Sequence, residues 1–174
     1  MNEFLDLANG ELNNNVPKRL THAKLLVKRF EDYVENNYSN CNLTIPVICA
    51  DIGCSKTYLH DLLTAKYNYS TKKYVEYFRI QKAIELIFSG TKNVYSLIGY
   101  KTYFVFYKSF LRVTGFNLKC FSAPELEKYK GIVSAENNIA SKGPKEAIQF
   151  IVNNSAIKDI LLEQKNKIKK PKNL

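Results

Sequence analysis

The stretch Leu43-Thr-Ile-Pro-Val-Ile-Cys-Ala-Asp-Ile-Gly-Cys-Ser55 determines the fold that this sequence predicts. Thr44 can cap a short helix whose first turn tolerates a proline. Gly53 can supply the positive φ of a tight turn, and Ser55 can then cap a second helix that runs through about residue 66. A short helix, a glycine turn and a serine-capped helix form the layout of a helix-turn-helix unit.

The pattern of the second helix recurs later in the chain. Two core residues, a turn residue and a polar residue occur twice with equal spacings: Leu59, Leu63, Asn68 and Ser70, and then Phe106, Phe110, Gly115 and Asn117. Between these copies, apolar residues at helical spacing predict a long helix from Thr71 to about Ser89. The sequence therefore predicts an all-α protein with two helix-turn-helix subdomains joined by a long linker helix, plus one or more additional C-terminal helices.

We expect five segments along the chain. They are a polar N-terminal arm (1–20), a first helix-turn-helix subdomain (21–70), the linker helix (71–90), a second helix-turn-helix subdomain (91–130) and a basic helical C-terminal extension (131–174). An arm of this length is too short to hold an effector-binding domain. In the extension, Pro144 can open a helix and Ser155 can cap another.

The charge of the chain points to an anionic partner. The 174 residues carry a formal net charge of +10, and the pI is near 9.4. Such a balance is typical of proteins that bind nucleic acid, an anionic membrane surface or an acidic protein. Between Leu86 and Pro124, lysine and arginine occur without any Asp or Glu. That region predicts an anion-binding surface, and an ordinary amphipathic helix with solvated lysines is the alternative.

The sequence offers no pattern for membrane insertion or secretion. No apolar run approaches the roughly 18 residues of a membrane helix. Residues 1–15 contain no Lys or Arg, whereas a secretory signal begins with positive charge. We therefore expect a cytoplasmic protein.

We also expect no catalytic residues, no metal site and no cofactor. The four cysteines lack C-x-x-C spacing, and two histidines, His22 and His60, cannot complete a zinc site. The thiols are expected to be reduced and to act as small apolar residues. His60 and Asp61 are sequence neighbours that point about 100° apart on a helix, so they do not suggest an acid–base pair.

The chain resembles a known family of proteins. Residues 26–121 resemble the DNA-binding domain of the AraC/XylS family of transcriptional regulators. The matching residues are Leu43-x-Ile-x-x-Ile-Cys-x-x-x-Gly-Cys-Ser-x-x-Tyr-Leu-x-x-Leu-Leu, then Tyr74, Arg79-Ile-x-x-Ala83-x-x-Leu86-Ile87, Gly99-Tyr, and Phe106-x-x-x-Phe110-x-x-x-x-Gly115. The resemblance implies seven helices, with two recognition helices that enter successive major grooves on one face of DNA. It also implies that Arg79 ties the first subdomain to the linker helix.

The chain departs from the family pattern in three places. Ile48 lies five residues before Gly53, but Leu97 lies only two before Gly99, so the second scaffold helix is about three residues short. We therefore expect Tyr100 to pack differently and the second recognition helix to be tilted or shifted. Asp61 stands on the outer face of the first recognition helix, where a carboxylate can accept from cytosine but repels phosphates. Leu118 replaces the family's usual proline.

The first recognition helix, about 55–66, supplies polar candidates for DNA binding. Positions that match the family's base-facing ones are Thr57, His60 and Asp61, with Lys56 beside them. Thr57 can contact a thymine methyl group, and His60 can donate to a purine edge. For His60, an ordinary solvent-facing position is the alternative.

The second recognition helix, about 102–113, supplies aromatic and basic candidates. Its candidates are Thr102, Tyr103, Phe104, Tyr107 and Lys108, and Lys108, which matches a family position that often holds a cation, is expected to contact a base or a phosphate. The cations better placed to contact phosphates are Lys101, Lys92 and Arg112. Phosphate contacts contribute affinity rather than sequence information. For the tyrosines, packing at the seam between subdomains is the alternative.

The C-terminal extension carries an apolar stripe that a partner could cover: Ile157, Ile160, Leu161 and Ile168. Its cover could be the chain's own domain, a second copy, another protein or a membrane surface, and of these we do not expect a membrane as a binding partner. We expect a sequence-specific DNA-binding transcription regulator without a ligand-binding domain, with activation as the working assumption and repression left open. RNA polymerase or another regulator is a candidate protein partner. One chain supplies two recognition helices, so we expect a monomer or weak dimer. The alternative function is a degenerate helix-turn-helix protein that acts as a co-regulator through its C-terminal helix.

Overall fold

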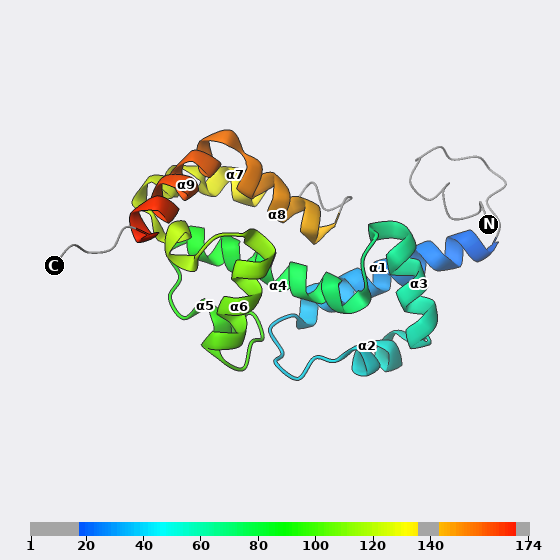
Figure 1. Ribbon diagram of the computed structural model, residues 1–174. Helices are drawn as coiled ribbons and strands as arrows, with labels where there is room; N and C mark the ends of the chain where they lie inside the picture. Colours follow the sequence, from blue (N-terminus) through cyan, green and yellow to red (C-terminus); the bar gives the residue numbers. More distant parts are fainter. Residues whose placement is uncertain (1–17, 136–142, 170–174) are drawn as a thin grey trace.

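All regular structure in residues 18–135 and 143–169, the residues that the computed structural model describes, is helical. The prediction of an all-α protein is therefore confirmed. The long helix α4 (Thr71–Phe88) passes through the middle of the molecule. Helices α1 (Lys18–Asn37), α2 (Ile45–Ile52) and α3 (Lys56–Tyr67) gather around its beginning, and α5 (Val94–Leu97) and α6 (Tyr103–Thr114) gather around its end (Figure 1).

The connection between α2 and α3 forms for the local reasons that the sequence suggests. Gly53 has φ 72°, and the Cys54 N–H donates to the Cys49 carbonyl at 3.0 Å. The Ser55 hydroxyl accepts from the Tyr58 N–H at 3.2 Å, so the predicted cap of α3 is confirmed. The predicted cap of α2 is wrong in one respect, because the Thr44 side chain makes no capping hydrogen bond.

Helix α5 has four residues, whereas α2 has eight. The expectation of a shortened scaffold helix is thus confirmed. Thr102 caps α6 by accepting from the Val105 N–H at 3.4 Å. Tyr100, which follows the turn, is half-buried, and its hydroxyl donates to the Ser109 hydroxyl at 3.0 Å.

Two cores lie along α4, one around its first half and the other around its second half. The first is built from α1, α2, α3 and the start of α4, with Phe30, Ile48 and Leu59 fully buried. The second surrounds Phe106 and Phe110 of α6. Arg79 of α4 holds the segment that follows α1: its Nε donates to the Tyr38 carbonyl at 2.9 Å and its Nη2 donates to the Asn40 carbonyl at 2.8 Å. The structural role that the resemblance implied for Arg79 is confirmed.

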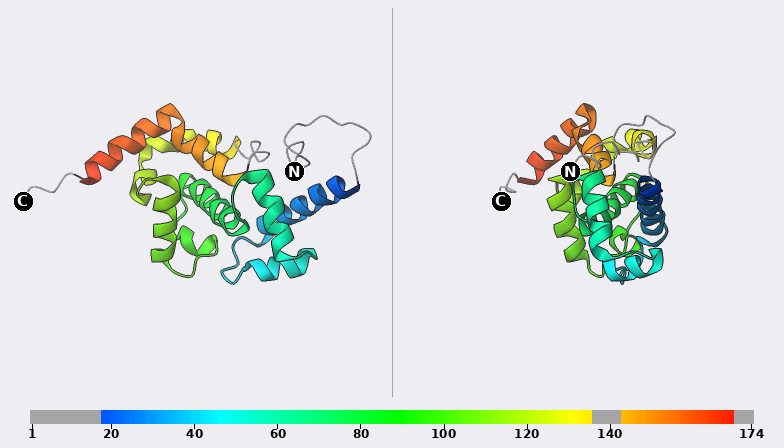
Figure 2. Two further views of the ribbon diagram at one scale, coloured as in Figure 1. Left: turned by 45° about the vertical axis from the view of Figure 1, so that its right-hand side comes forward. Right: turned by 90° about the vertical axis from the view of Figure 1, so that its right-hand side faces the viewer.

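The C-terminal extension contributes to the second core. After η2 (Leu118–Ser122), η3 (Pro124–Tyr129) and α7 (Lys130–Ala135), helix α8 (Pro144–Asn153) packs along α4, and α9 (Ser155–Lys169) packs on η2 and η3. Figures 1 and 2 show α8 and α9 on the side of α4 away from α2 and α5. Pro144 opens α8 as predicted, but Asn154 rather than Ser155 caps α9, by accepting from the Ile157 N–H at 3.3 Å.

Candidate nucleic-acid interface

The candidate residues of α3 lie on the face of the helix away from the core. Leu59, Leu62 and Leu63 are buried against the first core. The four predicted residues are all exposed: Lys56, Thr57, His60 and Asp61. They share one helix face because the buried leucines take the opposite one.

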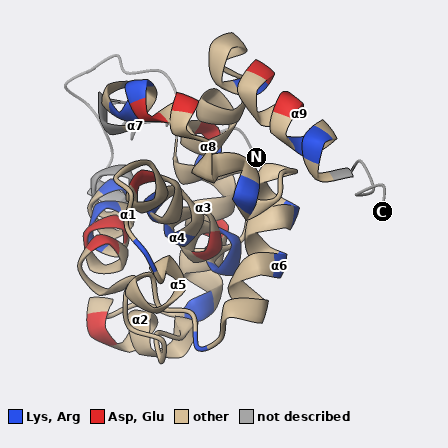
Figure 3. Cartoon of the chain, turned by 90° about the vertical axis from the view of Figure 1, so that its left-hand side faces the viewer, with Lys and Arg blue, Asp and Glu red and all other residues tan. Residues whose placement is uncertain are grey.

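The candidate residues of α6 are divided among different roles. Lys101, Thr102, Tyr103, Phe104, Lys108 and Arg112 are exposed. The Thr102 hydroxyl is engaged in the helix cap, and the half-buried Tyr107 accepts a hydrogen bond from the Asn117 amide at 3.0 Å. The Lys108 ammonium lies 4.3 Å from the centre of the Phe104 ring. Helix α6 contains lysine and arginine but no acidic residue (Figure 3).

Two adjoining hollows connect α3 with α6. The first, about 590 Å³, is lined by Lys56, Thr57 and His60 at the start of α3. The second, about 680 Å³, is lined by residues of α6 that include Phe104 and Lys108. Ile45 and Lys72 line both hollows, so the two hollows lie side by side, and we call them together the inter-unit groove.

The inter-unit groove is positively charged. The cations among its described lining residues are Lys56, Lys72, Arg79, Lys108 and Arg112, and the one carboxylate among them is Glu76. Low-dielectric walls lined by charges of one sign raise the local concentration of oppositely charged ligands. The groove is therefore suited to a polyanion that extends from α3 to α6.

Glu76 holds α6 against α4. It accepts hydrogen bonds from the Ser109 hydroxyl and the Arg112 guanidinium, and its other oxygen lies 3.4 Å from the Lys73 ammonium. Burial raises the pKa of Glu76, but these hydrogen bonds and the nearby positive charges outweigh burial, so its pKa lies below the ordinary value. Arg112, predicted to contact phosphate, is thus also a structural partner of α4.

This network makes stability depend on pH. A carboxyl whose pKa is lowered by folding stabilises the fold above its unfolded pKa of 4.5 and loses that contribution as the pH falls through the lower folded value. We expect Glu76→Gln to reduce the free energy of unfolding by about 1 kcal/mol at pH 7. The expected loss is this small because Arg112 is exposed, and solvent weakens its interaction with Glu76. The difference from the unaltered chain should shrink below pH 4.5 in urea unfolding followed by circular dichroism.

A matched control is available on the surface. Glu127 also has a pKa below its ordinary value, because the Lys130 ammonium donates to it, but this pair is exposed. Glu127→Gln should therefore leave stability almost unchanged at every pH. Equal effects of the two substitutions would contradict a special role for Glu76.

Lys72 is a groove cation that the sequence analysis missed. It is exposed on the first turn of α4 and lines both hollows. Its sequence neighbourhood carries no sign of this role, since the linker helix was assigned as a connection. Its importance follows from the fold, which brings the start of α4 between α2, α3 and α6.

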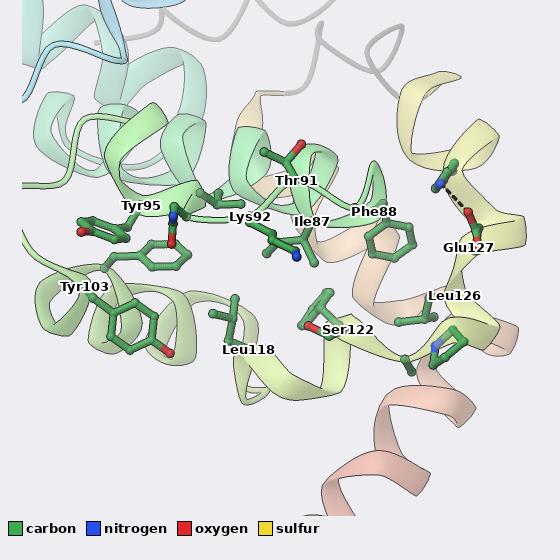
Figure 4. A pocket seen from close by; sticks show the side chains of 18 residues that line it. Ile87, Phe88, Thr91, Lys92, Tyr95, Tyr103, Leu118, Ser122, Leu126 and Glu127 are labelled. Atoms are coloured by element: carbon green, nitrogen blue, oxygen red, sulfur yellow. Dashed lines mark hydrogen bonds and ion pairs between the residues drawn. The ribbon is translucent and has the colours of Figure 1, made fainter.

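Lys92 and Tyr103 lie at a different hollow, of about 410 Å³, that shares no described lining residue with the inter-unit groove. Figure 4 shows Tyr95 and Tyr103 at one end of it, Phe88 and Leu126 at the other, and Lys92 between them. Lys101, Thr102 and Asp61 are exposed outside the lining of the groove. A single ligand surface therefore does not bring all of the predicted residues together.

The residues predicted for partner binding are also divided. Ile157 and Leu161 are fully buried in the second core, and Ile160 is half-buried against it. Ile168 is 44% exposed. The chain itself therefore covers most of the apolar stripe of α9.

Other site chemistry is limited in the described part of the chain. Among residues 18–135 and 143–169, no cluster of three or more His, Cys, Asp or Glu has metal-binding geometry. No helix within those residues has the length and apolar character needed to cross a membrane. Burial raises the pKa of the Cys54 thiol to about 11, so this thiol is protonated at neutral pH.

The comparisons with known proteins give one point of reference. No family model matches the chain, and no solved structure matches it. The chain is 31% identical over 86 residues to the raffinose operon transcriptional regulatory protein RafR of Pediococcus pentosaceus. The match covers 48% of this chain and 31% of that protein, so this chain spans under a third of the length of its relative. Over about half its length, then, the chain is similar to a transcriptional regulator, and this similarity supports a regulatory role.

Proposed function

We propose that the protein is a sequence-specific DNA-binding transcription regulator of the AraC/XylS type. In this proposal α3 and α6 are the recognition helices of two helix-turn-helix units, and α4 is the linker between them. The observation that carries the proposal is the inter-unit groove, because its two adjoining hollows are lined by Thr57 and His60 of α3 and by Lys108 of α6. The similarity to a transcriptional regulator is consistent with this role.

The charges of the groove suit the DNA backbone. Duplex DNA carries one negative charge per roughly 1.7 Å of its axis, and lysines that neutralise phosphates gain affinity by releasing counterions. Lys72 lies between the two recognition helices, where the backbone would pass from one major groove to the next. We therefore assign Lys72, Lys56 and Lys108 to phosphate contacts.

Helix α3 would read bases through polar side chains. The exposed side chains of α3 in the groove are polar, and Thr57 and His60 can hydrogen-bond base edges. Asp61 would favour a base with a major-groove amine, such as cytosine, because an ionised carboxylate can only accept a hydrogen bond.

The phosphate assignment gives a direct test. We expect Lys72→Ala combined with Lys108→Ala to weaken binding to all duplexes and to lower the slope of log affinity against log salt concentration by about 2. Both side chains are exposed, so the fold should be kept. Fluorescence anisotropy with a labelled duplex at several salt concentrations measures the slope.

The matched control removes the same charge elsewhere. Lys128 and Lys158 are exposed and outside the lining of the groove. Lys128→Ala combined with Lys158→Ala should leave the slope nearly unchanged. If both double variants lose affinity equally, the groove is not the contact surface and binding depends on net charge alone.

A protein-interaction role through α9 is the second candidate function. Leu162 and Ile168 are 40% and 44% exposed on that helix. Because Ile157 and Leu161 are committed to the chain's own core, the apolar surface left for a partner is narrow. The positively charged groove favours DNA as the main ligand.

A further inference from the structure

Helix α6 begins with three consecutive apolar side chains that project from the protein. Tyr103 is 52% exposed, Phe104 62% and Val105 54%, and among the side chains whose exposure the structure describes no other large apolar one is as exposed as these. The polar cap residue Thr102 precedes them, and the buried residue Phe106 follows. An exposed apolar patch of this kind on a helix end indicates a contact surface.

Two of the three side chains belong to the inter-unit groove. Phe104 and Val105 line its second hollow, whereas Tyr103 lines the separate hollow beside α5. The Lys108 ammonium lies over the Phe104 ring, 4.3 Å from its centre. An apolar pair beside a cation, in a groove rich in cations, fits a ligand that combines apolar groups with phosphates.

The major groove of DNA offers one apolar group. This is the C5 methyl group of thymine, since the other base edges there present hydrogen-bond donors and acceptors. The first residues of the second helix in a helix-turn-helix unit contact these edges. The side chains of Phe104 and Val105 have no hydrogen-bonding atom, so a thymine methyl group is the feature that they can distinguish.

We propose that Phe104 and Val105 select the half-site of α6 by covering thymine methyl groups, so that this half-site is rich in A·T pairs. This inference rests on the proposed DNA-binding function and adds a division of labour to it. Helix α3, with Thr57 and His60 in the groove, reads its half through polar side chains. Helix α6 reads the other half by burial of methyl groups.

Deoxyuridine tests the proposal because it differs from thymidine only by the missing methyl group. The full chain would first select binding sites from a random-sequence duplex pool at moderate salt. In the selected duplex, thymidines of one half are then replaced by deoxyuridine, and anisotropy gives the affinity. We expect about a fourfold loss for each methyl group that Phe104 or Val105 covers, and these losses should fall within one half-site.

Variants of Phe104 connect this loss to the helix. Phe104→Ala should bind more weakly and should no longer distinguish thymidine from deoxyuridine at one or more positions in that half. Phe104→Leu should keep part of the distinction because it retains an apolar group. Phe150→Ala, which truncates an exposed aromatic residue of α8 outside the groove, should behave like the unaltered chain. Thermal melting checks that each variant is folded.

The outcomes separate this inference from the proposed function. If a two-part motif is selected but deoxyuridine costs nothing in either half, the methyl-reading inference is wrong and the DNA-binding function stands. The inference is equally wrong if Phe104→Ala leaves affinity and methyl dependence unchanged, in which case the patch belongs to a protein contact. If the pool yields no preferred sequence, the proposed function itself fails.

Discussion

Gly99→Ala is expected to lower the free energy of unfolding by about 3 kcal/mol, from the cost of a left-handed backbone and the loss of a charged hydrogen bond. Gly99 has φ +78°, and a Cβ atom there would lie 2.4 Å from the Tyr38 carbonyl oxygen and 2.8 Å from Arg79 Nη2. The oxygen belongs to the backbone, so it cannot move aside by a rotamer change. The substitution would therefore separate Arg79 from Tyr38.

Gly99 lies where the segment after α1, helix α4 and the turn before α6 come together. Tyr38 belongs to the loop after α1, Arg79 to α4 and Gly99 to the turn before α6, and the three meet at one point. We therefore expect Gly99→Ala to disturb the relative placement of α3 and α6, and with it the binding of two-part sites. Urea unfolding measures the first effect, and binding to a selected duplex measures the second.

Gly115→Ala is the matched control. Gly115 has φ +75°, but a Cβ atom there would meet no atom within 4 Å. Gly115→Ala should lower the free energy of unfolding by about 1–2 kcal/mol, from backbone conformation alone. If the two alanine variants are equally stable, the close approach at Gly99 does not constrain the meeting of these segments.

Leu161→Ala is expected to destabilise the protein by about 3 kcal/mol, because large-to-small substitutions in a core lose both transfer free energy and contacts around the cavity. Leu161 is fully buried in the second core, which also holds Phe106 and Phe110 of α6. The substitution therefore tests whether α9 is part of that core. Differential scanning calorimetry or urea unfolding supplies the measurement.

Ile168→Ala, on the exposed part of the same helix, should change stability by less than about 0.5 kcal/mol. This pair of variants also separates folding from partner binding on α9. A stable Leu161→Ala variant that loses regulatory activity would contradict the account, because it would mean that Leu161 contacts a partner instead of the core.

The features that the sequence predicts well are local ones. Ser55 and Gly53 act within a few residues of themselves, so a cap and a tight turn can be recognised without knowledge of the fold. The shortened α5 is also local, because it follows from the spacing between Leu97 and Gly99. The all-α class follows from such signals repeated along the chain.

The features that the sequence did not reveal depend on contacts between distant segments. An apolar stripe on α9 shows that something covers it, but only the fold shows that Leu161 packs in the second core. In the sequence Arg112 has no evident partner, and only the fold shows that Glu76 of α4 lies beside it. Lys72 lies in the groove because residues of α2, α3 and the start of α4 come together there.

Selection from a random-sequence duplex pool with the purified chain tests whether α3 and α6 both read DNA sequence. We predict a two-part motif whose halves lie about one helical turn, ~10 base pairs, apart, because α3 and α6 would enter successive major grooves. Enrichment of such a motif at moderate salt would support two reading helices joined by the inter-unit groove. Binding that enriches no sequence and disappears steeply with salt would contradict this prediction, because it would show that the charge of +10 acts without readout of bases.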